Sequence, residues 1–289
     1  MVRLQLIRVL LGFAAVTALE LSSLPAQSQT STFDQIIARG TMVVGVRTDY
    51  PPTGYLDLEG KNVGFGPDIA RELAKHLGVK VQFVSETSQT RIQMLQNGQM
   101  DVAISSSTPT RTRNEVLDFT YPYIWDRGVI LVKKGASTKI ADYANDKVLV
   151  GNLQGATAFN EDWKRVSPNA QMRFYQETPD IFIALSQGKI DVAIVNESIA
   201  RLLLQKMGRQ LANLEIGEVV SWDPQAIAVR QNDSKWRNWL DWALQRLWAD
   251  GTFQALYKKN YLIDPPFHFW DNGQLQPGVL EIGKQNDKW

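Results

Sequence analysis

Apolar and polar positions follow two periodicities along most of the chain. Short apolar runs, typical of buried strands, occur at Met42–Val46, Val79–Val84, Val129–Val132 and Val148–Val150. Apolar residues at helical spacing predict helices at Ser198–Met207 and Trp236–Trp248, and Thr252 is a candidate N-cap for a last helix. This alternation predicts α/β lobes whose ligand sites lie at strand ends and helix starts.

An internal repeat supports two related lobes. Residues 95–104 read LQNGQMDVAI and residues 185–194 read LSQGKIDVAI, with six of ten positions identical at an offset of 90 residues. In each copy a helical stretch ends at a glycine, Gly98 or Gly188, as expected for a left-handed residue that closes a helix. The short apolar run that follows is typical of a strand buried in a parallel sheet. A chance match between similar helix–strand units is the alternative.

The N-terminus has the layout of a secretory signal peptide. Arg3 and Arg8 precede an apolar run of 11 residues, Val9–Leu19, and small residues follow up to Ser28. A membrane anchor is the alternative, but a spanning helix needs about 20 apolar residues. We expect cleavage after Ala26 or Ser28. Because no cysteine is available for lipid attachment, we expect the mature protein to be free in the periplasm.

Composition narrows the class of protein further. The 289 residues are 44% hydrophobic and 21% charged, which is enough for two lobes with their own cores. The formal net charge is +1, from 31 basic and 30 acidic side chains, so nothing favours nucleic acid as a partner. The absence of cysteine excludes disulfides and cysteine zinc sites. With two histidines and no metal-ligand spacing, we expect no metal or other cofactor.

Four stretches then carry a family resemblance. They read RGTMVVGVRTDYPPTGYLDLEGKNVGFGPDIARELAKHLGV (39–79), SSSTPTRTRNEVLDFTYPY (105–123), LQGAT (153–157) and ADGTFQALYKKNY (249–261). In this order they resemble the extracytoplasmic solute-binding proteins of polar amino-acid ABC transporters, family 3. The resemblance implies the type II periplasmic binding protein fold, two Rossmann-like α/β lobes joined by two crossing hinge strands.

The resemblance also implies a domain layout and partners. Residues 1–28 are the signal peptide, 29–125 the first part of lobe 1, 126–221 lobe 2, and 222–289 the rest of lobe 1 with a C-terminal tail. The implied partners are an amino-acid ligand and a membrane ABC permease, with the protein itself a monomer. The lobes are expected to close on the ligand about the hinge.

Arg113 is the main candidate for binding the ligand's α-carboxylate. A planar guanidinium pairs with a carboxylate through two hydrogen bonds, and Arg113 lies in the first turn of a short helix that Thr110 caps. Ser106 and Thr108, just upstream, offer hydroxyl or backbone N–H donors, and the resemblance assigns this cluster to the α-carboxylate. The alternative is that Arg113 pairs with Glu115 or another surface acid.

A narrower resemblance points to the glutamate/aspartate-binding branch. It rests on VVGVR, which supplies Arg47, and on TSQTRIQMLQNG (87–98), which supplies Ser88 and Arg91. Three arginines around one neutral amino acid leave positive charge unbalanced, so a ligand with a second carboxylate fits better. Alternatively, Arg47 or Arg91 reaches solvent and the ligand is a neutral or polar amino acid. Tyr50 either covers the ligand's apolar stem or packs as a turn residue.

Candidates in lobe 2 include two departures from the family pattern. Backbone N–H groups of Gly155-Ala156-Thr157 and the Thr157 hydroxyl precede a helix near Phe159 and are candidates for a second carboxylate. Asn196 stands where the family usually has an aspartate for the ligand's ammonium, with Glu197 beside it. Either Glu197 supplies the charge, or the ammonium is bound less tightly, or the ligand is a dicarboxylate without an ammonium. Thr178 stands where the acidic-ligand branch often has histidine.

Three classes of function remain to be compared. We expect a binding protein and not an enzyme, because His76 and His268 belong to no recognisable acid–base set. A prephenate or arogenate (cyclohexadienyl) dehydratase on the same fold is the enzyme alternative, with Glu197 as its general acid. A receptor-like sensor is less consistent with the sequence, since no spanning helix or signalling domain follows.

Overall fold

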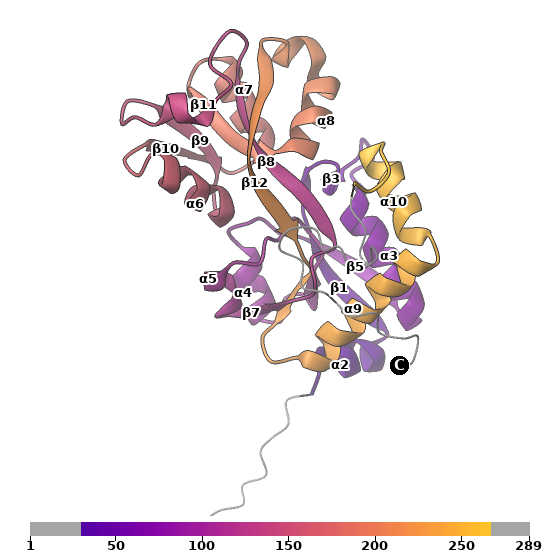
Figure 1. The fold of residues 1–289 in the computed structure, drawn as a ribbon. Coiled ribbons are helices and arrows are strands. Elements are labelled where there is room, and N and C mark those ends of the chain that lie inside the picture. The colour runs from indigo at the N-terminus through magenta and orange to yellow at the C-terminus, as the bar shows by residue number, and fades with distance from the viewer. Residues whose placement is uncertain (1–29, 267–289) are drawn as a thin grey trace, which may run out of the picture. The chain divides into compact units, whose positions relative to one another are not determined.

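The computed structural model describes residues 30–266, apart from the side chains of residues 157, 158 and 160–162. The predicted signal peptide and the tail from residue 267, including His268, lie outside the described residues. The described elements form two five-stranded sheets and one small three-stranded sheet (Figure 1). Lobe 1 denotes here the elements around the first sheet, and lobe 2 those around the second.

Lobe 1 is built around a mixed sheet in the order β5-β1-β6-β13-β7. Its strands are β1 (Thr41–Val46), β5 (Lys80–Ser85), β6 (Val102–Ala103), β7 (Leu117–Phe119) and β13 (Ala228–Arg230). A small sheet beside it contains β2 (Asp49–Tyr50), β3 (Gly54–Leu56) and β4 (Asn62–Val63). The helices are α2 (Thr32–Arg39), α3 (Phe65–Leu77), α4 (Arg91–Gln96), α5 (Arg111–Asn114), α9 (Ser234–Ala249) and α10 (Thr252–Tyr261).

Lobe 2 is built around a second mixed sheet, in the order β10-β9-β11-β8-β12. Its strands are β8 (Ile124–Lys133), β9 (Leu149–Leu153), β10 (Gln171–Tyr175), β11 (Val192–Asn196) and β12 (Leu214–Gln225). Its helices are η1 (Ile140–Tyr143), α6 (Thr157–Val166), α7 (Thr178–Ser186), α8 (Glu197–Met207) and η2 (Gly208–Leu211). The long strands β8 and β12 pair antiparallel and carry the chain between the lobes (Figure 1).

The sequence repeat forms the same helix–strand unit in both lobes. Asp101 accepts a hydrogen bond from the Val43 amide at 2.7 Å, and Asp191 accepts one from the Leu149 amide at 2.8 Å. The strand after each aspartate pairs in parallel with the strand at which that hydrogen bond is made, β6 with β1 and β11 with β9. Gly98 has φ 68° and Gly188 has φ 73°, which confirms the left-handed helix ends.

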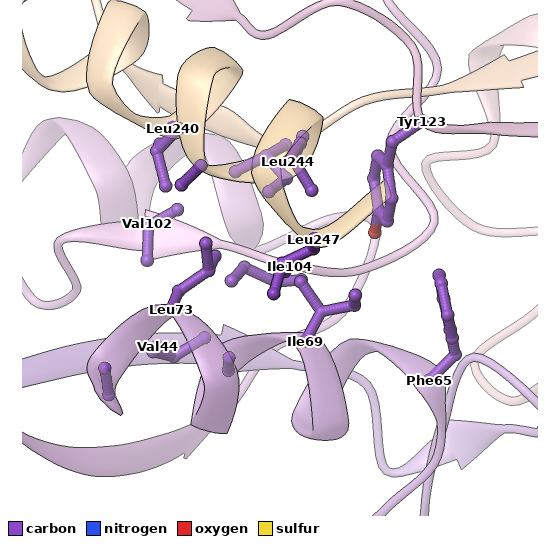
Figure 2. Close-up of a cluster of buried hydrophobic side chains, with 14 of the residues drawn as sticks. Val44, Phe65, Ile69, Leu73, Val102, Ile104, Tyr123, Leu240, Leu244 and Leu247 are labelled. Carbon is purple, nitrogen blue, oxygen red and sulfur yellow. The ribbon is translucent and has the colours of Figure 1, made fainter. Parts of the chain in front are cut away.

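The core of lobe 1 lies between the first sheet and helices α3 and α9. Figure 2 shows leucines of α9 and the apolar face of α3 meeting around Val102 and Ile104 of the central strand region. Leu240 and Leu73 are fully buried there, so truncation of either to alanine would cost about 2–5 kcal/mol of stability. This rigid core holds the strand ends and loops that form the site described below.

Two predictions about local structure were wrong. The strands of the repeat do not lie in purely parallel sheets, because β13 and β8, which enter or leave through the hinge, pair antiparallel with β6 and β11. Thr252 does not cap the last helix through its side chain. Gly251 occupies the N-cap position with φ 85°, and Thr252 is the first helical residue.

Candidate ligand site

A pocket lies between the two lobes, at the ends of their strands, as the α/β pattern predicts. It holds about 530 Å³ of empty space, including the part open to solvent. Lobe 1 contributes Arg47, Tyr50, Ser88, Ser106, Thr108 and Arg113 to its wall; lobe 2 contributes Leu153, Ala156, Phe159, Thr178 and Asn196; and the hinge strand β12 contributes Asp223. The wall thus combines an apolar side from lobe 2 with polar groups that converge from all three parts.

Arg113 is held in this wall without an acidic partner. Thr110 caps α5 by accepting the Arg113 backbone N–H at 3.3 Å, as predicted. The guanidinium donates to the carbonyl of Thr108 at 2.9 Å and to that of Gly155 at 3.0 Å. It forms no ion pair within residues 30–266, so the alternative pairing with Glu115 is wrong. Burial, with the charge of Arg91 nearby, lowers the Arg113 pKa to about 10.

Arg47 lines the pocket, but the protein already neutralises it. Its Nε and Nη2 donate to the two carboxylate oxygens of Asp49, at 2.8 and 2.6 Å. Nη1 donates to the Ser88 hydroxyl at 3.0 Å, and the guanidinium lies 5.0 Å from the Tyr50 ring centre. The prediction that Arg47 offers a free charge to a second ligand carboxylate is therefore wrong, because the carboxylate of Asp49 already pairs with it.

Arg91 lies behind the pocket wall and is not part of its lining. Its guanidinium forms two hydrogen bonds with Glu86, at 2.8 and 2.9 Å, and a third with the Ser106 carbonyl at 2.9 Å. Both ionised side chains are almost fully buried. Arg91 thus holds the loop that carries Ser106, and Glu86 neutralises its charge, so its contact with ligand stays a prediction without support from the pocket lining.

Tyr50 and Asn196 join the lobes to the hinge. The Tyr50 hydroxyl donates to the Asn196 side-chain oxygen, and the Asn196 amide donates to Asp223 at 2.6 Å. All three side chains are buried. Asn196 is the N-cap residue of α8, yet its side chain makes no capping bond. Instead, Asp126 accepts hydrogen bonds from the Ser198 backbone N–H and hydroxyl. The Asn196 side chain is therefore not needed as a cap and lines the pocket.

Glu197 is turned away from the pocket lining. It pairs with Arg127 at 2.5 Å and with Arg201 at 2.5 Å. Both arginines neutralise Glu197, and it lies outside the pocket lining, so its role as counter-charge for an ammonium stays a prediction that this geometry does not favour.

Asp223 is the buried acid that the sequence analysis missed. It lies in a strand after an exposed tryptophan, and no motif marks it. The unusual Asn196 was the available signal, since an asparagine at that position leaves the site in need of an acid from elsewhere.

The lobe 2 loop before α6 reaches lobe 1 through its backbone. Gly155 has φ 81°, and a side chain there would stand 2.8 Å from the Gln89 backbone nitrogen, so only glycine fits. Its carbonyl faces Arg113, whereas we expected N–H groups here. The helix begins at Thr157, two residues before Phe159. The Thr157 side chain lies outside the described residues, so its role stays a prediction.

Thr178, at the start of α7, adds a polar group to the pocket. Its backbone N–H donates to Asp49 of lobe 1 at 3.1 Å. Its hydroxyl is buried and has no hydrogen-bond partner in the described part of the chain. A buried hydroxyl without a partner is costly, so it is available to a polar ligand group.

Residues 30–266 contain neither a membrane-spanning helix nor a metal-binding cluster of side chains. None of the helices there combines the length and apolarity needed to cross a bilayer. Acidic and histidine side chains in the same range do not gather in groups that would hold a metal ion.

Comparisons with known proteins agree with this architecture. The L-cystine-binding protein TcyJ of Escherichia coli K12 is 30% identical over 252 residues, covering 86% of this chain and 93% of TcyJ. The glutamine-binding protein GlnH of Bacillus subtilis 168 is 29% identical, covering 83% and 88%. The crystal structure of the ancestral amino acid-binding protein AncCDT-1, a precursor of cyclohexadienyl dehydratase, matches with a TM-score of 0.73 and 32% identity, covering 80% of this chain and 100% of that one.

The family model extends across both lobes. It matches residues 42–262, which include the pocket, both sheets and the two hinge strands. The predicted fold class, a type II two-lobed periplasmic binding protein fold, is confirmed by this match and by the structural neighbours. The chain belongs to the bacterial extracellular solute-binding proteins, family 3.

Proposed function

We propose that this protein captures an α-amino acid in the periplasm and delivers it to the permease of an ABC transporter. The observation that carries the proposal is Arg113, a buried guanidinium without an acid, in a pocket between two hinged lobes. A ligand α-carboxylate would replace the two carbonyl contacts of Arg113 by an ion pair with two parallel hydrogen bonds, which is stronger. The names of the relatives, which bind cystine and glutamine, support this class of ligand.

The balance of charge favours a ligand with an uncharged side chain over glutamate or aspartate. Asp49 neutralises Arg47, and Glu86 neutralises Arg91. A second ligand carboxylate would have to displace one of these pairs, which costs free energy in a buried site. The end of the pocket near Arg47 still offers polar groups, the Ser88 and Thr178 hydroxyls. A polar, neutral side chain such as an amide suits them.

Closure of the lobes would complete the site. Arg113 of lobe 1 already contacts Gly155 of lobe 2, and Asp49 contacts Thr178 across the same gap. Ligand bound first to lobe 1 would favour the closed arrangement through contacts that exist only there. The closed form is the one a permease would recognise.

A ligand panel tests the proposal. The mature protein is titrated with the common amino acids, cystine, dicarboxylates and prephenate, and melting temperature and Kd are measured. We expect neutral polar amino acids to bind at least tenfold tighter than glutamate and aspartate. If glutamate binds most tightly, and Arg47→Ala weakens the binding of glutamate more than that of glutamine, the ligand is an acidic amino acid. Turnover of prephenate would make the protein an enzyme.

A further inference from the structure

Asp223 is a buried carboxylate with neutral partners only. It accepts hydrogen bonds from the Thr108 hydroxyl at 2.5 Å, the Asn196 amide at 2.6 Å and the Gln225 amide at 3.1 Å. Within residues 30–266 no basic side chain lies within 4.0 Å of it, and only 2% of Asp223 is exposed. A buried carboxylate is stable when a cation also faces it, and the pocket is the open side of this one.

Asp223 and Arg113 are connected through one residue of the pocket wall. Thr108 contacts both residues: its carbonyl accepts from Arg113 and its hydroxyl donates to Asp223. A guanidinium and a carboxylate, neither of them in an ion pair with a described residue, thus lie on either side of Thr108, and both line the same pocket. An α-amino acid carries its carboxylate and its ammonium on one carbon, so it presents one charge of each sign to a pocket whose wall holds the two opposite ones.

We propose that Asp223 of the hinge strand binds the ligand's α-ammonium and thereby makes the site selective for amino acids over simple carboxylic acids. The inference rests on the proposed function, since it takes Arg113 as the carboxylate site. Asn196 positions the carboxylate from lobe 2 and accepts the Tyr50 hydroxyl from lobe 1. The acid therefore lies on the hinge strand and not at the start of α8, and residues of both lobes donate hydrogen bonds to it.

The test uses ligand pairs that differ only in α-amino groups, one in the case of glutamine and two in the case of cystine. Wild type and Asp223→Asn are titrated calorimetrically with L-glutamine against glutaramate, and with L-cystine against 3,3′-dithiodipropionate. We expect wild type to prefer the amino acid of the pair it binds by at least 100-fold. In Asp223→Asn we expect a loss of at least 100-fold for the amino acid, with less than a fivefold change for the analogue. The matched control is Asp126→Asn, a buried hinge acid directly opposite Asp223 but outside the pocket lining.

A charge-swapped variant guards against a folding defect in the single substitution. Asp223→Asn combined with Asn196→Asp keeps one acid and one amide in hydrogen-bond contact, and both positions line the pocket. We expect it to recover preference for the amino acid to within tenfold of wild type. The inference is overturned if wild type or the swapped variant binds the amino acid and its analogue equally well. It is also overturned if Asp223→Asn keeps the wild-type preference. In either case the role of Arg113 and the proposed function stand. A wild type that binds no member of the amino-acid panel would overturn the proposed function, and this inference with it.

Discussion

Two buried clusters of charge lie close together in this protein, and they are balanced in different ways. Around Arg47 and Arg91, each guanidinium has its own carboxylate at 2.6–2.9 Å. Around Arg113 and Asp223, the guanidinium contacts only carbonyls and the carboxylate contacts only neutral donors. The first cluster is complete without ligand, whereas the second has one unsatisfied charge of each sign.

The difference predicts which charges are structural and which bind ligand. A neutralised pair fixes the loops that carry pocket residues, as Arg91 fixes Ser106. An uncompensated buried charge costs stability, and a ligand of opposite charge relieves that cost. Substitutions in the first cluster should therefore act mainly on folding, and substitutions in the second mainly on binding.

The largest expected effect is on folding, from Glu86→Gln. It leaves Arg91 buried with its charge unpaired, which typically costs 3–5 kcal/mol. We expect the free energy of unfolding, measured by urea denaturation, to fall by about that amount. Glu115→Gln, at an exposed acid two residues after Arg113, is the control and should change stability by less than about 0.5 kcal/mol. A loss below about 1 kcal/mol in Glu86→Gln would show that the pair is not structural.

The next largest effect is on binding, from Arg113→Met. Loss of a paired ionic contact to the ligand carboxylate should weaken amino-acid binding at least 100-fold, or about 3 kcal/mol. Burial already disfavours the charged form, as the lowered Arg113 pKa indicates, so unliganded stability should stay equal or rise. Calorimetry and urea denaturation measure the two effects. The control Arg111→Met, on the exposed side of α5, should change neither binding nor stability. If Arg113→Met lost stability but still bound amino acids, Arg113 would be a structural residue and not a binding residue.

The arrangement of elements could be predicted from the sequence to a large extent. Apolar periodicity located the strands and helices because both depend on local pattern, and the repeated glycine and aspartate marked equivalent units in the two lobes. The antiparallel pairings of β13 and β8 could not be predicted, since they depend on where the chain returns through the hinge.

The charge balance of the site was harder to predict. Arg113 was identified through its cap and its motif, and Asn196 through its departure from the family pattern. Arg47 and Arg91 looked equally available, although Asp49 stands only two residues after Arg47 and that spacing places both side chains on one face of an extended segment. Asp223 pairs with groups far away in sequence, and only the fold brings these together.

A third expected effect is a gain of stability from Asp126→Asn. Burial raises the Asp126 pKa to about 6, with the charge of Asp223 adding to the shift, so the folded state binds a proton more tightly than the unfolded one. The stability of wild type should fall as pH rises from about 4 to about 6, and the asparagine variant should lack this loss.

We therefore expect Asp126→Asn to be more stable than wild type by about 1–3 kcal/mol at pH 7.5, with the difference vanishing near pH 4. Urea denaturation at several pH values measures it. Amino-acid affinity should change less than tenfold, because Asp126 lies outside the pocket lining. A variant that is less stable at pH 7.5, or equally different at both pH values, would contradict this assignment.

The smallest effect is expected from Glu197→Gln, which compares the acid that the sequence offered as one alternative with Asp223, the acid that lines the pocket. Arg127 and Arg201, its partners, are 44% and 68% exposed, so water can solvate them once the carboxylate is lost. We expect a stability loss of about 1 kcal/mol or less, from the ion pairs and the favourable charge at the start of α8. Amino-acid affinity, measured beside Asp223→Asn in the same titration, should stay within twofold of wild type. A loss for Glu197→Gln as large as that for Asp223→Asn would mean that the negative field of the hinge region as a whole, and not one carboxylate in contact, attracts the ammonium.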